Sequence, residues 1–235
     1  KGGDMRNAIP AFCDVVLTLP KENVEAFKEV VDEWRQTLKE EYYPIEQTFE
    51  LKVEDVELPT HIVPAEIQDN LVDALCACHN GVFRMIPEVP NIVETSSNLS
   101  IVEIGEGKAQ FLLLIRSSRD SMRECCAETL ESAFSMAGMK VELSGDYPAW
   151  QPNPHSEIVE LMKSVYKELF GTDNKVQVVH AGLECGVIGA WHPMDMVSFG
   201  PTLRSPHTPN ERCNIPSVEK YWKFVLTTLE RTPRK

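Results

Sequence analysis

The chain has 235 residues, of which 43% are hydrophobic and 25% are charged, a composition typical of folded globular proteins. This length exceeds that of one typical domain, about 100 to 150 residues, so we expect two domains. The formal net charge of -13 excludes nucleic acid and anionic membrane surfaces as partners, because both are themselves negatively charged. No apolar stretch approaches the roughly 18 residues of a membrane helix, which argues against a membrane protein.

The seven cysteines are an odd number at irregular spacing, a pattern typical of free thiols in the cytoplasm. The sequence therefore predicts a cytoplasmic protein without disulfides. One cluster of metal-ligand type, Cys76-Ala77-Cys78-His79, lacks a second pair at zinc-finger spacing. It also lies on the apolar face of a predicted helix, so we expect it to be part of the core.

Strand and helix signals alternate along residues 1–144, where apolar periods of 2 and 3.6 residues follow one another. The motif Gly105-Glu106-Gly107-Lys108 separates two of the predicted strands and indicates a hairpin. In chain order, the predicted elements are a strand at 11–19, a helix at 22–38, a strand at 48–58, a helix at 64–78, strands at 91–104 and 110–117, a helix at 120–136 and a strand at 140–143.

Proline and glycine accumulate at residues 144–154, and we place a domain boundary there, between residues 1–144 and 145–235. In the second part, Ser156 is expected to cap a helix that ends at residue 170, and Ser217 to open the last helix. Short apolar runs at 176–179 and 194–199 predict buried strands. The sequence thus predicts an α+β first domain, with antiparallel strands and helices, and an α/β second domain.

Polar side chains gather in the loops that follow the last two predicted strands, at residues 180–186 and 200–211. In open α/β sheets, sites form at the carboxyl ends of strands, where both loops would emerge. His207 lies between two prolines, which restrict the backbone on either side. A histidine in such a loop is either a surface or hydrogen-bonded residue or a rigidly placed metal ligand, and composition alone leaves both open.

Several motifs together resemble the aminoacyl-histidine dipeptidases, the peptidase D branch of the dizinc exopeptidases. The most specific is HAGLECG at residues 180–186, followed by MDMVSFGP at 194–201 and by His207. Other segments resemble the same branch and follow its order along the chain. They are RNAIP at 6–10, VETS at 93–96 with Asn98, LIRS at 114–117, YP at 147–148 and WQP at 150–152. The resemblance covers essentially the whole chain.

This resemblance implies zinc-dependent hydrolysis of dipeptides, preferentially those with a C-terminal histidine, by an intact protein in which two zinc ions are bound. His207 matches the late histidine ligand of that family. The other ligands, the general base and a lid histidine have no match here, so we expect no catalytic residue in the chain, little or no bound zinc, and no activity of the chain alone. Residues 1–144 then correspond to most of a lid domain, and 145–235 to the closing part of the catalytic domain.

The resemblance also assigns substrate-binding roles. Arg116 matches an arginine associated with the C-terminal carboxylate of the substrate, a task that suits a planar fork of donors, although a surface salt bridge is the alternative. Asn7 resembles a lid asparagine that reaches toward the substrate, and an asparagine before a strand is also a common turn residue. Glu184 and His180 lie in a loop that resembles a wall of the family's substrate pocket.

Two other function classes remain to be weighed against the peptidase. Lid domains of the superfamily often mediate assembly, so the chain could be a non-catalytic lid, dimerisation or peptide-binding module, and a homodimer is compatible with either class. A cysteine hydrolase that uses Cys185 with His180 is disfavoured, because two residues on one short loop form poor geometry for a nucleophile and its base and no third group orients them.

Overall fold

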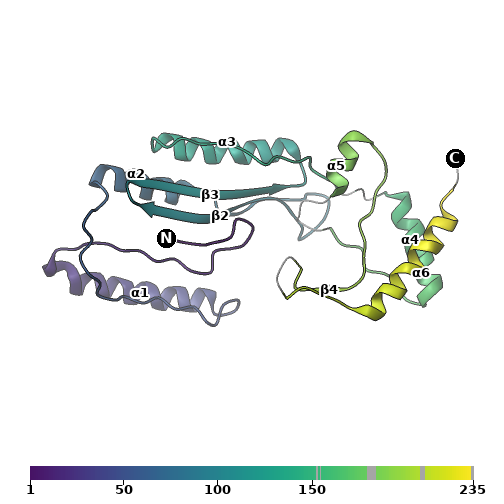
Figure 1. The fold of residues 1–235 in the computed structure, drawn as a ribbon, viewed down its shortest axis with the longest axis horizontal. Coiled ribbons are helices and arrows are strands. Elements are labelled where there is room, and N and C mark those ends of the chain that lie inside the picture. Colours follow the sequence, from purple (N-terminus) through teal and green to yellow (C-terminus); the bar gives the residue numbers. More distant parts are fainter. Residues whose placement is uncertain (152, 154, 179–183, 207–209, 234–235) are drawn as a thin grey trace. The chain divides into compact units, whose positions relative to one another are not determined.

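The computed structural model describes residues 1–151, 153, 155–178, 184–206 and 210–233. By its internal contacts the chain divides into two compact units, one of Lys1–Val72 with Ser100–Leu112 and one of Asp73–Leu99 with Leu113–Lys235. The elements in chain order (Figure 1) are a 3₁₀ turn η1 at Lys21–Asn23, α1 at Val24–Tyr42, α2 at Ala65–Ala77, β1 at Gly81–Met85, β2 at Val93–Gly105, β3 at Lys108–Ser117, α3 at Asp120–Met136, α4 at Glu157–Phe170, α5 at Glu184–Trp191, β4 at Leu203–Arg204, β5 at Arg212–Cys213 and α6 at Ile215–Arg231.

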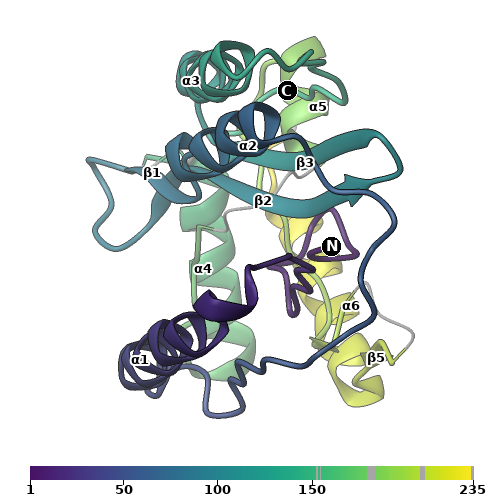
Figure 2. The ribbon, with the colours of Figure 1, turned by 90° about the vertical axis from the view of Figure 1, so that its left-hand side faces the viewer.

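The central sheet has the strand order β1-β2-β3, with β1 antiparallel to β2 from Gly81 opposite Ser97 to Met85 opposite Val93. A two-residue turn joins β2 to β3, and both turn residues have positive φ, 50° at Glu106 and 72° at Gly107. Positive φ at both positions is the requirement of the type I′ turn, whose twist matches that of paired strands. The predicted hairpin is therefore confirmed (Figure 2).

Helix α3 occupies the range expected from its apolar spacing, and it buries Cys126, Ala127, Leu130 and Phe134 on one face. The Ser97 hydroxyl lies close enough to the Cys126 thiol to lower its pKa, against the larger opposite effect of burial, so α3 lies over the face of the sheet from which Ser97 projects. His79, after α2, also hydrogen-bonds Ser97, with 2.8 Å from Nδ1 to Oγ. Cys78 is buried nearby, as expected for a core cluster, whereas Cys76 is exposed.

Helices α4 and α6 lie side by side and bury a small core of Met162, Val165 and Phe224 (Figure 1). Each helix has a strongly amphipathic sequence, so pairing removes both apolar stripes from water. The ring of Tyr166 meets that of Phe224 edge to face, with 5.3 Å between centroids. On the polar side, Arg231 forms an ion pair with Glu168 through two hydrogen bonds. The pair is thus fixed by both apolar and charged contacts.

Several predicted strands are not formed. No strand ladder forms in the segments 11–19, 48–58, 140–143, 194–199 and the described residues of 176–179, apart from a single bridge between Cys13 and Gly2. Apolar side chains in them are open to solvent, with Val15 73% and Val16 64% exposed. A strand exists only with a hydrogen-bonded neighbour, and an alternating or apolar run does not reveal whether one is present.

The last helix begins two residues before the predicted start. Asn214, not Ser217, is the N-cap, because its side chain accepts a hydrogen bond from the Ser217 backbone N–H at 3.0 Å, and Pro216 fits the first turn. Residues 184–186, expected to lie in a loop, form the start of helix α5. Among the described residues, no helix is long and apolar enough to cross a bilayer.

Candidate functional site

Arg116 is the next-to-last residue of β3 and is half-buried. Within the described part of the chain, its guanidinium makes no hydrogen bond or ion pair. The neighbouring arginines behave differently, since Arg84 and Arg119 both lie at a carboxylate. A half-buried guanidinium retains its charge and all five N–H donors, so Arg116 is equipped to bind an external carboxylate or phosphate.

The chain directly after Arg116 is tied back to β2. The Thr95 hydroxyl donates to Ser117 Oγ at 2.8 Å, and Ser117 Oγ donates in turn to the Arg119 carbonyl at 2.8 Å. The Arg119 backbone N–H donates to the same Ser117 Oγ at 3.0 Å, and the Ser118 N–H donates to the Glu94 carbonyl at 3.0 Å. Residues 117–119, at and just after the end of β3, are therefore each fixed by a hydrogen bond.

Sequence reasoning gave Glu94 no role beyond its place in a motif. Its side chain is only 2% exposed, and it lies between two guanidinium groups, with Arg84 Nε 3.5 Å from Oε1 and Arg119 Nε 3.4 Å from Oε2. Oε1 accepts no hydrogen bond from the residues that the structure describes. The available signal was an acidic residue inside a predicted strand, where a buried carboxylate requires a charge partner.

Asn7 lies in an exposed turn in which the Ala8 N–H donates to the Met5 carbonyl at 3.3 Å. The Ser100 hydroxyl of β2 donates to the Arg6 carbonyl at 2.5 Å and fixes this turn to the strand. The turn and the exposed amide are compatible with both alternatives from the sequence, a turn residue and a substrate-binding asparagine.

Glu184 is the exposed first residue of α5. This short helix packs closely against the segment before α4, because a Cβ on Gly186 would lie 2.5 Å from the Pro148 carbonyl oxygen. Burial, together with the neighbouring Glu184 carboxylate, raises the pKa of the Cys185 thiol. A raised pKa leaves less thiolate at neutral pH, which argues further against Cys185 as a nucleophile.

His180 and His207 lie outside the described residues. In the part of the chain that is described, no three His, Cys, Asp or Glu side chains gather closely enough to hold a metal ion. Arg116 and Glu184 likewise make no hydrogen bond or ion pair with each other there. The described residues thus do not by themselves form a zinc site.

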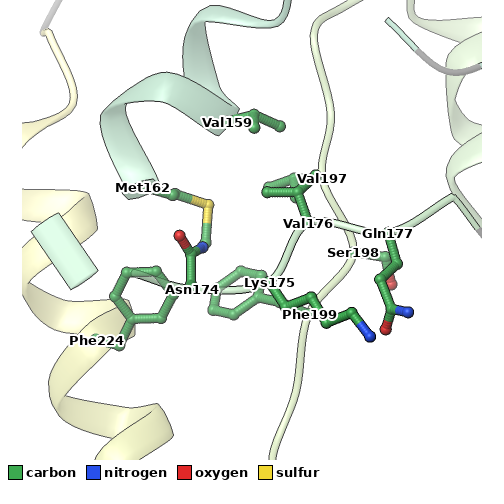
Figure 3. A pocket seen from close by; sticks show the side chains of 10 residues that line it. All are labelled: Val159, Met162, Asn174, Lys175, Val176, Gln177, Val197, Ser198, Phe199 and Phe224. Atoms are coloured by element: carbon green, nitrogen blue, oxygen red, sulfur yellow. The ribbon is translucent and has the colours of Figure 1, made fainter. Parts of the chain in front are cut away.

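A cavity of about 100 Å³ lies between α4, α6 and two extended segments (Figure 3). Val159 and Met162 reach it from α4 and Phe224 from α6, and Asn174 brings its side chain to the same space. Pockets for small-molecule ligands usually measure about 300 to 1,000 Å³. The cavity is therefore too small for a dipeptide and is better described as a gap in the packing.

Comparisons with known proteins identify the fold. The chain is 35% identical over its whole length to cytosol non-specific dipeptidase of Escherichia coli (strain K12), of which it covers 48%. It is 20% identical over 139 residues, 59% of the chain, to succinyl-diaminopimelate desuccinylase of Sulfurovum sp. (strain NBC37-1), covering 38% of that protein. The crystal structure of aminoacylhistidine dipeptidase from Vibrio alginolyticus matches the whole chain with a TM-score of 0.89 at 39% identity, covering 48% of that protein.

The resemblance to the aminoacyl-histidine dipeptidases and the predicted mixture of α/β and α+β structure are thereby confirmed. The chain spans about half the length of the two dipeptidases that it matches. The sequence model of Peptidase family M20/M25/M40 covers residues 15–231, nearly all of the chain. The chain therefore belongs to peptidase family M20/M25/M40.

Proposed function

We propose that the chain is part of a cytoplasmic zinc-dependent dipeptidase that prefers substrates with a C-terminal histidine. Two similar proteins support this reading, because one is named a cytosol non-specific dipeptidase and the other an aminoacylhistidine dipeptidase. Their names differ in specificity, so the preference for histidine depends on the motif at residues 180–186. Residues 1–144 form the lid domain and residues 145–235 the closing part of the catalytic domain.

The observation that carries the proposal is the state of Arg116. It is half-buried at the end of a strand, and its guanidinium has no partner among the described residues. The alternative role, a structural salt bridge, requires a carboxylate partner, and none of the ion pairs within the described ranges includes this arginine. Arg116 therefore binds the C-terminal carboxylate of the dipeptide. Asn7, Glu184 and His180 complete the substrate-binding set.

His207 is the metal ligand that this chain contributes, and zinc supplies the Lewis acid and activated water of the hydrolysis when it is bound. The family's other ligands and its general base have no match in the motifs of this chain, so the proposal assigns them to other parts of the intact protein. The contribution of this chain to catalysis is to hold the substrate by its carboxylate and to add one imidazole to the metal site.

A second candidate is a non-catalytic lid or dimerisation module, in which a homodimer covers the first unit. Exposed apolar side chains favour it, since Val15, Val16 and Trp34 are 73%, 64% and 58% exposed. Such a surface is typical of an interface. The longer sequence distinguishes the two candidates, because an HxD motif and a Glu-Glu pair in it support the enzyme.

The proposal is tested by Arg116→Ala in the full-length protein. Removal of a charge-assisted hydrogen bond, worth about 1.5 to 3 kcal/mol, should lower kcat/KM for a dipeptide by roughly 10 to 150-fold, with zinc content unchanged. A dipeptide with an amidated C-terminus has no carboxylate to offer. Its kcat/KM should already be low with the parent enzyme, and Arg116→Ala should lower that value little further.

Arg231→Ala is the matched control, because it removes a surface arginine that pairs with Glu168 and, within the described ranges, makes no hydrogen bond or ion pair with Arg116, Asn7 or Glu184. It should leave kcat/KM for both substrates nearly unchanged. If Arg116→Ala weakens the free and amidated dipeptides equally, the arginine supports the fold and the carboxylate-binding role is wrong.

A further inference from the structure

The buried carboxylate of Glu94 is an unusual feature of β2. It is 2% exposed, while the two arginine side chains beside it are each 39% exposed. A buried carboxylate loses its hydration and is retained only where charged partners compensate. Both contacts are long, 3.5 Å from Arg84 and 3.4 Å from Arg119, and Oε1 accepts no hydrogen bond within the described ranges. The contacts of the buried Glu94 carboxylate are therefore weaker than those of a well-formed buried ion pair.

Strand geometry places Glu94 and Arg116 on the same face of the sheet. Thr95 and Ser117 meet side chain to side chain, with 2.8 Å between their hydroxyl oxygens. Successive side chains of a strand point to opposite faces, so the preceding residues, Glu94 and Arg116, both project from the other face. Arg116 thus projects from the same face as the Glu94 carboxylate, which itself pairs with Arg84 and Arg119.

We propose that Glu94 is a positioning residue for Arg116. Three interactions hold the end of β3. They are the ion pair between Glu94 and Arg119, the hydrogen bond from the Ser118 N–H to the Glu94 carbonyl, and the hydrogen bond between the Thr95 and Ser117 hydroxyls. Pairing with Arg84 and Arg119 occupies the carboxylate, so that Arg116 stays unpaired and available to the substrate. The inference rests on the proposed role of Arg116 in binding the substrate's C-terminal carboxylate.

The physical reason lies in the geometry of a guanidinium and a carboxylate. Two parallel hydrogen bonds form only when the planes of both groups coincide, so a small rotation of the arginine loses one of them. A displacement of about 1 Å in a binding group can cost up to about 100-fold in rate. The last residues of an edge strand move readily unless other bonds hold them.

The decisive variant is Glu94→Gln in the full-length enzyme, which keeps the shape of the side chain and removes its charge. We expect kcat/KM for a free dipeptide to fall about 10-fold, mainly through KM, because Arg116 is misplaced for the carboxylate. The amidated dipeptide should be hydrolysed at the parent rate. The double variant Glu94→Gln with Arg116→Ala should be no worse than Arg116→Ala alone, since both act on one interaction.

Two further variants keep the test decisive. Glu103→Gln is the matched control, because Glu103 is an exposed glutamate of the same strand and pairs with Lys1. It should leave kcat/KM for both dipeptides unchanged. Arg119→Gln removes one partner of Glu94 from a half-exposed position. If Glu94→Gln fails to fold, Arg119→Gln decides the question, and it should show the same loss confined to the free dipeptide.

The outcomes separate the two proposals. In the first case, Arg116→Ala lowers kcat/KM for the free dipeptide only, whereas Glu94→Gln and Arg119→Gln lower kcat/KM equally for both dipeptides or for neither. Glu94 then has a purely structural role, and the positioning role is overturned. When Arg116→Ala itself shows no loss confined to the free dipeptide, the proposed function fails, and the positioning role falls with it.

Discussion

At the scale of single residues, the arginines of the second unit are used in different ways. Arg123 binds two carboxylates and a carbonyl, reaching Asp120 at 2.8 Å, Asp146 at 2.9 Å and the Tyr147 carbonyl at 2.5 Å. It therefore fastens the segment after α3. Arg116 has no such partner among the described residues. Ion pairs of the first kind stabilise local structure, whereas an unpaired guanidinium in a half-buried position is available for a ligand.

The proposed ligand role of His207 predicts a defect in the metal site. Even the loss of groups that only support zinc ligands costs about 10 to 100-fold in metal affinity or activity, so His207→Ala in the full-length protein should lose zinc and nearly all turnover. Zinc is measured by elemental analysis after dialysis. His192→Ala, which changes an exposed histidine after α5, should retain both. Normal zinc content in His207→Ala would exclude His207 as a ligand.

At the scale of elements, the N-terminus of α4 is capped by two side chains, those of Ser156 and Asp195. Ser156 accepts a hydrogen bond from the Val159 N–H at 3.2 Å, and Asp195 accepts from Ser156 Oγ at 2.8 Å and from the Ile158 N–H at 3.1 Å. Burial alone would raise the pKa of Asp195, but the bonds from Ile158, Ser156 and Asn153 outweigh it, and the pKa is lowered. A carboxylate at this place also compensates the positive end of the helix dipole.

Asp195→Asn should lower the free energy of unfolding by about 1 kcal/mol near neutral pH, because it removes the charge from this cap. A lowered folded-state pKa adds stability that is complete above the unfolded value of about 3.9 and is lost as pH falls through the folded-state pKa. Urea unfolding at pH 7 and pH 3 checks this, and the difference in unfolding free energy between the two proteins should be smaller at pH 3. Asp173→Asn, an exposed pair with Lys167, should have a smaller effect. An equal difference at both pH values would contradict the charge-based explanation.

The sequence predicted elements well where local signals agree. Helix α3 has its predicted bounds, and α4 runs from its Ser156 cap to Phe170 as expected. Helix α5 was missed because its residues, ECGVIGAW, are mostly apolar and show no polar face, so no period of 3.6 is visible. The strands predicted at 11–19, from an apolar run, and at 48–58, from alternation, are not formed, because neither pattern shows whether a hydrogen-bonded neighbour is present.

The same limit applies to the candidate site. The position of Arg116 at the end of a strand follows from the sequence, since β3 begins near and ends at its predicted bounds. The pairing of Glu94 with Arg84 and Arg119, by contrast, joins residues that approach one another only in the folded sheet. Side-chain pairing between distant residues has no local signal, so neither the free state of Arg116 nor the burial of Glu94 could be predicted.

At the scale of the whole molecule, the chain alone is expected to lack peptidase activity. On the proposed assignment the chain contributes one metal ligand, His207, and a single imidazole neither holds the ion nor supplies a base. Elemental analysis of the dialysed 235-residue chain should find far less than stoichiometric zinc, and dipeptide cleavage should be undetectable. The full-length protein is the positive control. Stoichiometric zinc in the chain alone would mean that it contains ligands other than His207.

The burial of Cys126 has a practical consequence for all these variants. All seven cysteines, each among the described residues, are free, and Cys125 is exposed while its neighbour Cys126 is fully buried. Burial raises the pKa of Cys126 to about 11, so in the folded chain this thiol is both shielded and protonated. Alkylating reagents should label Cys125 rapidly and Cys126 only when α3 leaves the sheet. The ratio of labelling at these adjacent thiols is a built-in reporter that tells a misfolded variant from one that has lost only its ligand contacts.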